Sequence, residues 1–129
     1  MENIEVLLTG LHCLVLEDEF LIALDIQQIL ETAGAARVTC VGTVTDALAV
    51  LRGGEKFDLA VLDVKLNGAR RTSFDVATEL RRLRIPFIFL TGMRADEIST
   101  AQFPTAPVVE KPYQAPLLLE AIAQAFKRR

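Results

Sequence analysis

Residues 59–63 read Leu-Ala-Val-Leu-Asp, four consecutive apolar residues followed directly by an acid. A short run of this kind is typical of a strand that is buried on both faces, as in the middle of a parallel sheet. The other short apolar runs lie at 11–16, 37–42, 87–90 and 108–109. Helix signals follow each run, and this alternation predicts an α/β domain whose parallel sheet has helices on both faces.

The expected helices cover residues 20–33, 46–51, 74–83, 95–101 and 116–127. Gly34 is a good stop for the first of them, and Thr43 or Thr45 can cap the second. Thr72 or Ser73 can cap the third, whereas the stretch 95–101 carries only a weak helical pattern. We expect residues 11–129 to form one domain, and residues 1–10 to be a short tail or an extra helical turn.

The composition excludes several classes of protein. The chain has 129 residues, of which 51% are hydrophobic and 24% charged, with a formal net charge of −3. This balance is typical of one globular domain and argues against nucleic-acid binding through a basic surface. No apolar run reaches the roughly 18 residues of a membrane span, and the N-terminus lacks a signal peptide, so we expect a cytoplasmic protein. We interpret Cys13 and Cys40 as reduced, buried thiols, and His12 as a strand-edge residue.

Polar residues follow four of the five expected strands. Glu17 and Asp18 come after the first strand, Asp63 after the third, Thr91 after the fourth and Lys111 after the fifth. Because all strands of an open parallel sheet end at one edge, and ligands bind in the crevice there, these side chains are expected to converge. Taken singly, each has an ordinary interpretation as a solvated turn, a cap or an exposed lysine. Their occurrence together, each directly after its own strand, favours a functional site.

The chemistry of this group is restricted. Three carboxylates close together repel one another unless a cation compensates, and oxygen ligands suit Mg²⁺. Lys111 adds a positive charge for phosphate oxygens, and Thr91 adds a hydroxyl group. An aspartate beside Mg²⁺ and a lysine is equipped to attack phosphorus. The residues therefore predict that Asp63 accepts a phosphoryl group.

The sequence resembles the receiver domain of two-component response regulators over residues 11–126. The motifs are LVLEDE with Glu17 and Asp18, LAVLDVKL with Asp63, FIFLTG with Thr91, and VVEKPY with Lys111. The resemblance implies a flavodoxin-like, doubly wound (βα)5 three-layer sandwich. Its parallel five-stranded sheet has the strand order 2-1-3-4-5, with five helices.

The resemblance also implies roles for single residues. Asp63 matches the phosphoacceptor, Asp18 the direct metal ligand, and Glu17 a residue that acts on the metal mainly through water. The backbone carbonyl of Lys65 would complete the protein ligands of Mg²⁺.

Further roles follow from the same resemblance. Thr91 matches the switch hydroxyl, and Lys111 matches the lysine that pairs with the phosphoryl group or with Asp63. The Lys111–Pro112 peptide bond is expected to be cis, which is a minority state even for bonds to proline.

The sequence departs from the family pattern at three places. Leu66-Asn67-Gly68 replaces a proline that often follows the phosphoacceptor. Val108 stands where many receivers have an aromatic residue, so the usual aromatic rotamer switch is unavailable. The segments around Thr91 and Lys111 look like a subfamily nicknamed FAT GUY, although Leu90 and Arg94 differ from its pattern. That subfamily is commonly paired with kinases of the HWE and related classes.

We therefore expect a signalling domain and not a metabolic enzyme. A sensor histidine kinase or phosphotransfer protein would supply the phosphoryl group, and the domain would catalyse its own phosphorylation and slow dephosphorylation. We expect a monomer or weak homodimer that acts on other proteins, without direct contact to nucleic acid or membrane. The main alternative is a degenerate receiver that only mediates protein contacts.

Two other classes fit the residues poorly. A haloacid dehalogenase-type phosphatase needs an acid two residues after its nucleophile, where this chain has Lys65. A flavodoxin-like cofactor binder needs a phosphate loop after the first strand, where Glu17-Asp18-Glu19 would repel phosphate.

Overall fold

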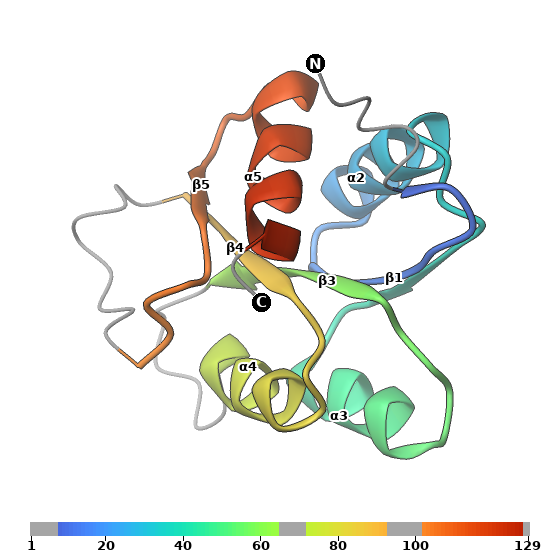
Figure 1. The fold of residues 1–129 in the computed structure, drawn as a ribbon, viewed down its shortest axis with the longest axis vertical. Helices are drawn as coiled ribbons and strands as arrows, with labels where there is room; N and C mark the ends of the chain where they lie inside the picture. The colour runs from blue at the N-terminus through green and yellow to red at the C-terminus, as the bar shows by residue number, and fades with distance from the viewer. Residues whose placement is uncertain (1–7, 65–71, 93–101, 128–129) are drawn as a thin grey trace.

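The computed structural model of the protein describes residues 8–64, 72–92 and 102–127. The strands are β1 (His12–Leu16), β2 (Arg37–Val41), β3 (Leu59–Val64), β4 (Phe87–Thr91) and β5 (Val108–Glu110). The helices are α2 (Phe20–Thr32), α3 (Val44–Arg52), α4 (Ser73–Arg82) and α5 (Ala115–Lys127). The five strands form one parallel sheet in the order β2-β1-β3-β4-β5 (Figure 1).

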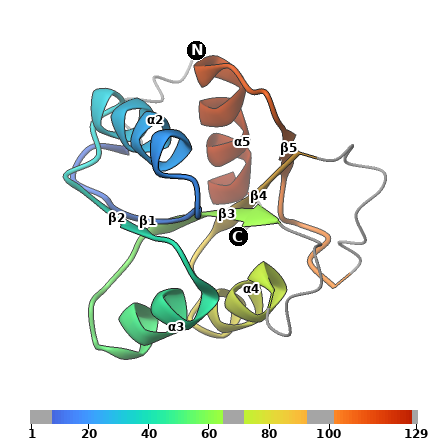
Figure 2. The same ribbon diagram turned by 180° about the vertical axis from the view of Figure 1, so that it is seen from behind.

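The sheet lies between two layers of helices. Helices α2 and α5 cover one face, and α3 and α4 cover the other, as the view from behind also shows (Figure 2). Because successive side chains of a strand point to opposite faces, each strand contributes alternate residues to two separate cores. In β3, Val61 packs under α2 and α5, whereas Leu62 packs under α3 and α4. All six residues of β3 are buried, as its central position requires.

This architecture confirms the predicted α/β fold, the strand order and the parallel pairing. Four of the five expected helices lie in the described part of the chain, and the expected helix over 95–101 lies outside it. The third strand is longer than predicted and extends to Val64, so Asp63 lies inside β3 and not beyond its end. Of the first ten residues, residues 8–10 are described, and Leu8 is fully buried against the α2 and α5 side of the sheet.

Local sequence signals explain two helix starts. The side chain of Thr43 accepts a hydrogen bond from the backbone of Asp46 and so caps α3. Thr72 and Asp75 form a capping box at the start of α4. The side chain of Thr72 accepts a hydrogen bond from the backbone N–H of Asp75, and Oδ2 of Asp75 accepts one from the backbone N–H of Thr72. These bonds satisfy backbone N–H groups that have no partner within a helix.

Both cysteines are free thiols, but their environments differ from the prediction for one of them. Cys13 in β1 is buried, and burial raises the pKa of its thiol to about 12. Cys40, predicted to be buried, is exposed. The reason is that β2 is an edge strand, which has only one neighbour in the sheet. Among the described helices, none is both long and apolar enough to cross a membrane.

Candidate functional site

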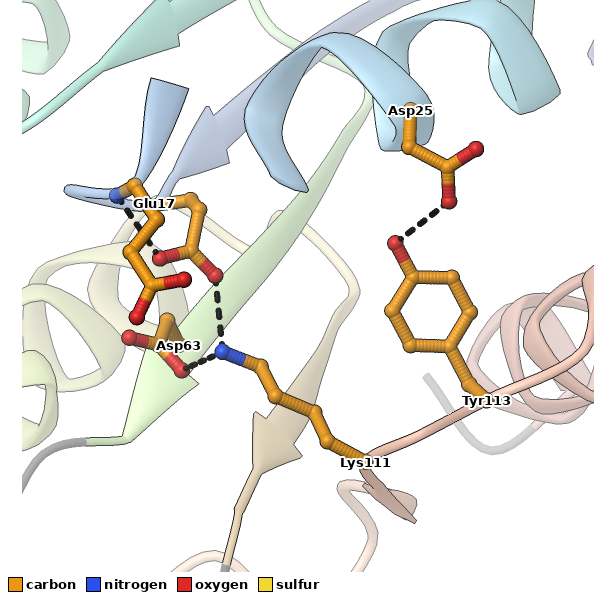
Figure 3. Close-up of polar contacts among 6 residues, drawn as sticks. Glu17, Asp25, Asp63, Lys111 and Tyr113 are labelled. Atoms are coloured by element: carbon orange, nitrogen blue, oxygen red, sulfur yellow. Dashed lines mark hydrogen bonds and ion pairs between the residues drawn. The ribbon is translucent and has the colours of Figure 1, made fainter. Parts of the chain in front are cut away.

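The predicted site residues lie at the carboxyl edge of the sheet. Glu17 directly follows β1, Asp63 is the next-to-last residue of β3, Thr91 is the last residue of β4, and Lys111 directly follows β5. The side chains of Glu17, Asp63 and Lys111 point toward one another (Figure 3). Parallel pairing of the strands brings these residues together although up to 94 positions separate them in the chain.

Lys111 is at the centre of the group. Its Nζ lies 2.8 Å from Oε1 of Glu17 and 2.8 Å from Oδ1 of Asp63, so one ammonium bridges two carboxylates. All three side chains are largely withdrawn from solvent, with 17% of Lys111, 4% of Asp63 and none of Glu17 exposed. The Coulombic attraction between charges shielded from solvent in this way is stronger than between charges on the surface, although their removal from water opposes it.

A backbone hydrogen bond fixes the position of Lys111 at the sheet edge. Its N–H donates to the carbonyl oxygen of Thr91 at 2.6 Å, which ties the end of β5 to the end of β4. The Lys111–Pro112 peptide bond is cis, as the resemblance implied.

The electrostatics of the group depend on burial and on the two ion pairs. Burial is the largest effect on Glu17 and raises the pKa of its carboxyl, and the hydrogen bonds from Lys111 and from the Glu19 N–H only partly offset it. For Lys111, burial lowers the pKa, but the bonds to Asp63 and Glu17 outweigh it and raise the pKa above its ordinary value. The ammonium of Lys111 therefore stays charged at neutral pH, whereas burial disfavours the ionised form of the Glu17 carboxyl.

Three carboxylates at this edge offer a place for a metal ion. Glu17, Asp18 and Asp63 each have a ligand atom within 4.8 Å of the others' atoms, with Asp18 exposed. If all three are ionised, Lys111 leaves two formal negative charges, which a divalent cation would neutralise. An all-oxygen donor set with one side open to water fits Mg²⁺. The expected fourth ligand, the carbonyl of Lys65, lies outside the described residues.

Thr91 reaches the same edge from β4. It is fully buried and pairs in register with Val64, the residue after Asp63, and with Glu110, the residue before Lys111. Thr91 thus lies between β3, which carries Asp63, and β5, which leads directly into Lys111.

Two contacts of this site were not predicted from the sequence. One is the ion pair between Lys111 and Glu17, since only Asp63 was expected as a partner. The other is a hydrogen bond of 2.9 Å from the hydroxyl of Tyr113 to Oδ2 of Asp25 (Figure 3). It ties the segment after Lys111 to α2, the helix that follows the acidic residues. Burial and the bond to Asp25 raise the pKa of Tyr113, so the phenol remains a donor at neutral pH.

Val108 in β5, which replaces the aromatic residue of many receivers, lies beside a group of four aromatic side chains. Val108 pairs with Phe89 and packs partly buried against this side of the core. The rings of Phe74, Phe87, Phe89 and Phe103 lie with centroids 5.4–6.1 Å apart where they meet. Phenylalanines from other elements therefore occupy the core beside the valine.

Comparison with known proteins decides the family. The model of the response regulator receiver domain family matches residues 13–123. The chain belongs to this family. Receivers are signalling domains of two-component systems, not metabolic enzymes, and they generally bind Mg²⁺ and interact with histidine kinases or phosphotransfer proteins.

Several relatives are similar over most of this receiver. The phyllosphere-induced regulator PhyR of Methylorubrum extorquens is 26% identical over 113 residues, which are 88% of this chain but 42% of that regulator. A solution structure of SdrG from Sphingomonas melonis is 36% identical, with a TM-score of 0.75, and the match covers 98% of this chain and 99% of SdrG.

Two crystal structures extend the comparison. A receiver protein from Sinorhizobium medicae has a TM-score of 0.81 at 26% identity, covering 93% of this chain and 98% of that one. The anti-anti-sigma factor PhyR of Bartonella quintana has a TM-score of 0.78 at 29% identity, covering 97% of this chain and 52% of that one. The chain thus spans about half or less of the PhyR proteins.

Proposed function

We propose that this receiver accepts a phosphoryl group on Asp63 from a phosphohistidine, in a reaction that depends on Mg²⁺, and that this modification switches its contacts with other proteins. The observation that carries the proposal is the double ion pair of Lys111 with Asp63 and Glu17 in a largely buried site. These ion pairs hold the ammonium of Lys111 beside Asp63, where it can pair with the oxygens of an incoming phosphoryl group.

The transfer follows from the chemistry of the residues. An oxygen of Asp63 attacks phosphorus, the new O–P bond forms, and the N–P bond to the donor imidazole breaks. The imidazole keeps the bonding electrons and takes up a proton. Lys111 neutralises charge on the phosphoryl oxygens, and Thr91 supplies a hydroxyl that can donate to one of them. Mg²⁺ held by Glu17, Asp18, Asp63 and the Lys65 carbonyl would add further positive charge for those oxygens.

The consequence of phosphorylation is a change of local charge. When Lys111 turns to the phosphoryl group, its pairing with Glu17 and Asp63 changes, and the backbone bond between Lys111 and Thr91 transmits the change to β4 and β5. With Val108 in β5, this route does not include an aromatic rotamer at that position. We propose that the output is a protein contact, which agrees with the name anti-anti-sigma factor given to a relative.

We also propose the subfamily, the oligomeric state and the cellular location of this receiver. Membership of the FAT GUY subfamily, and hence a kinase of the HWE or a related class, rests on the motifs around Thr91 and Lys111. We further propose a monomer or weak homodimer in the cytoplasm.

Beryllofluoride, which mimics a phosphoryl group on aspartate, provides the test. Amide NMR spectra of the labelled protein should change at Thr91 and Lys111 when beryllofluoride is added with Mg²⁺, and should not change without Mg²⁺. The Asp63→Asn variant should show no such change, whereas Asp46→Asn, an exposed acid in the first turn of α3, should respond like the wild type. A degenerate receiver would give no Mg²⁺-dependent change in the wild type, and that result would overturn the proposal.

A further inference from the structure

A second feature lies at the opposite end of β4 from the phosphorylation site. A pocket of about 510 Å³ opens where α4 ends and β4 begins, and the segment before β5 and the end of α5 complete it. Its lining residues are Arg81, Arg84, Ile85, Pro86, Phe87, Thr105, Ala106 and Ala125. The volume falls within the range of known ligand-binding clefts, roughly 300–1,000 Å³.

The pocket has an apolar floor and a cationic rim. Phe87, Pro86 and Ala125 are buried, whereas Arg81 and Arg84 are both exposed. None of the lining residues is acidic, in a chain whose formal net charge is −3. The two guanidinium groups therefore form a local reversal of charge beside apolar surface.

Arg81 is held in place by its neighbours. Its Nη1 donates to the carbonyl oxygen of Gln102 at 2.7 Å, and its Cζ lies 5.0 Å from the centroid of the Phe103 ring. A guanidinium carries five N–H donors, so one bond to Gln102 leaves others for an incoming group. The stacking on Phe103 and the bond to Gln102 already restrict the Arg81 side chain. Arg81 therefore loses less conformational entropy when it binds an incoming carboxylate.

Arg84 has an unusual backbone conformation. Its φ is 61°, and it is the only non-glycine residue with positive φ among those the structure describes. This position, just after the end of α4, favours glycine, because a side chain is strained there. Within the described ranges, no hydrogen bond or ion pair engages its guanidinium. The positive φ belongs to the Schellman turn that ends α4, in which the Ile85 N–H donates to the carbonyl oxygen of Leu80 and the Arg84 N–H to that of Arg81. Glycine would serve this turn as well, so the turn does not require the guanidinium, which is left to pair with an incoming group.

We propose that this pocket binds an acidic segment of a partner protein, which inserts an apolar side chain and places carboxylates against Arg81 and Arg84. Charge complementarity selects the acidic partner. The exposure of both arginines selects a polypeptide, because a small ligand is usually enclosed over most of its surface, whereas a peptide keeps its charged groups at the rim. The proposal does not depend on phosphorylation of Asp63.

The test uses two acetylated hexapeptides, one reading Glu-Glu-Leu-Phe-Glu-Glu and one with every Glu replaced by Gln. In amide NMR titrations of the whole protein, the acidic peptide should shift Ile85, Phe87, Ala106 and Ala125, and added salt should weaken binding. The Gln peptide should bind at least about tenfold more weakly, since charge-assisted bonds are lost.

Arg84→Gly separates binding from folding. Glycine suits the positive φ, so the midpoint of thermal unfolding should stay equal or rise, while affinity for the acidic peptide falls about tenfold. Arg37→Ala, which removes an exposed arginine from β2, should leave the affinity unchanged. Equal affinity for both peptides, unchanged affinity in Arg84→Gly, or shifts confined to other surfaces would overturn the proposal. Binding of benzoate but not of the peptide would overturn it in favour of a small organic anion.

Discussion

Replacement of Lys111 by Met gives a prediction that follows directly from the site geometry. Methionine preserves most of the side-chain volume but removes the ammonium that lies 2.8 Å from both Glu17 and Asp63. The two carboxylates, with ligand atoms within 4.8 Å, would then face each other without compensation. At an effective dielectric constant of about 20, this repulsion is roughly 3 kcal/mol.

A loss of unfolding free energy of this size agrees with the cost of breaking other buried ion pairs. Removal of one partner from such a pair costs about 3–5 kcal/mol. Since Lys111 retains 17% exposure and solvent reaches the edge of the sheet, we expect the lower end, about 3 kcal/mol at pH 7. For a domain of this size that loss corresponds to a fall of roughly 10 °C in the unfolding midpoint. Lys56→Met, which changes an exposed lysine, should cost less than about 0.5 kcal/mol.

The dependence on pH distinguishes electrostatics from packing. As pH falls, Glu17 becomes protonated, since burial raises the pKa of its carboxyl. The repulsion then disappears, and the loss of stability in Lys111→Met should shrink. Mg²⁺ should stabilise the variant more than the wild type, because it replaces the missing charge. Urea unfolding followed by circular dichroism suits a chain without tryptophan. A loss of stability that is the same at pH 4.5 and pH 7, or no loss at all, would show that the Lys111 charge does not stabilise the site.

Other predictions concern the same site and the core. Glu17 has a raised pKa when folded, so its contribution to stability is present below its usual value of 4.5 and is lost as pH rises through the folded pKa. Glu17→Gln should therefore unfold at higher urea than the wild type at pH 7 without divalent metal, and at the same urea below pH 4.5. An unaltered pH profile would contradict this. Phe103→Ala should cost about 3–5 kcal/mol in urea titrations, since Phe103 is 3% exposed and its ring meets three others, whereas Leu83→Ala, 37% exposed, should cost under about 1 kcal/mol. Thr72→Ala should cost about 1 kcal/mol by the same assay, and no change would argue against the capping box.

Much of the fold and site could be predicted because the relevant signals are local. The four residues before Asp63 are all apolar, which is typical of a strand buried on both faces. Glu17, Asp63, Thr91 and Lys111 were predicted from their places at the ends of apolar runs, and the parallel sheet brings those ends together at one edge. The Lys65 carbonyl was expected only from the family resemblance, and it lies outside the described residues. The boundaries were less certain, as Asp63 within β3 shows, because a buried acid interrupts the apolar pattern without ending the strand.

The features that were missed depend on distant parts of the chain. The bond between Tyr113 and Asp25 joins residues 88 positions apart, and no local pattern marks either of them. The exposure of Cys40 follows from the position of β2 at the edge of the sheet, which an apolar neighbourhood in the sequence does not reveal. The pairing of Lys111 with Glu17 depends on side-chain conformations at the sheet edge, which residue order does not specify.

The central claim is that Asp63 accepts the phosphoryl group. The most direct measurement is to treat the protein with acetyl phosphate and Mg²⁺, reduce the acyl phosphate with borohydride, and locate the modified residue by peptide mass spectrometry. The account predicts conversion of Asp63 to homoserine, dependent on Mg²⁺ and absent in Asp63→Asn, with Asp18 and Glu17 unmodified. Modification of another carboxylate, or none at Asp63 with Mg²⁺ present, would contradict it.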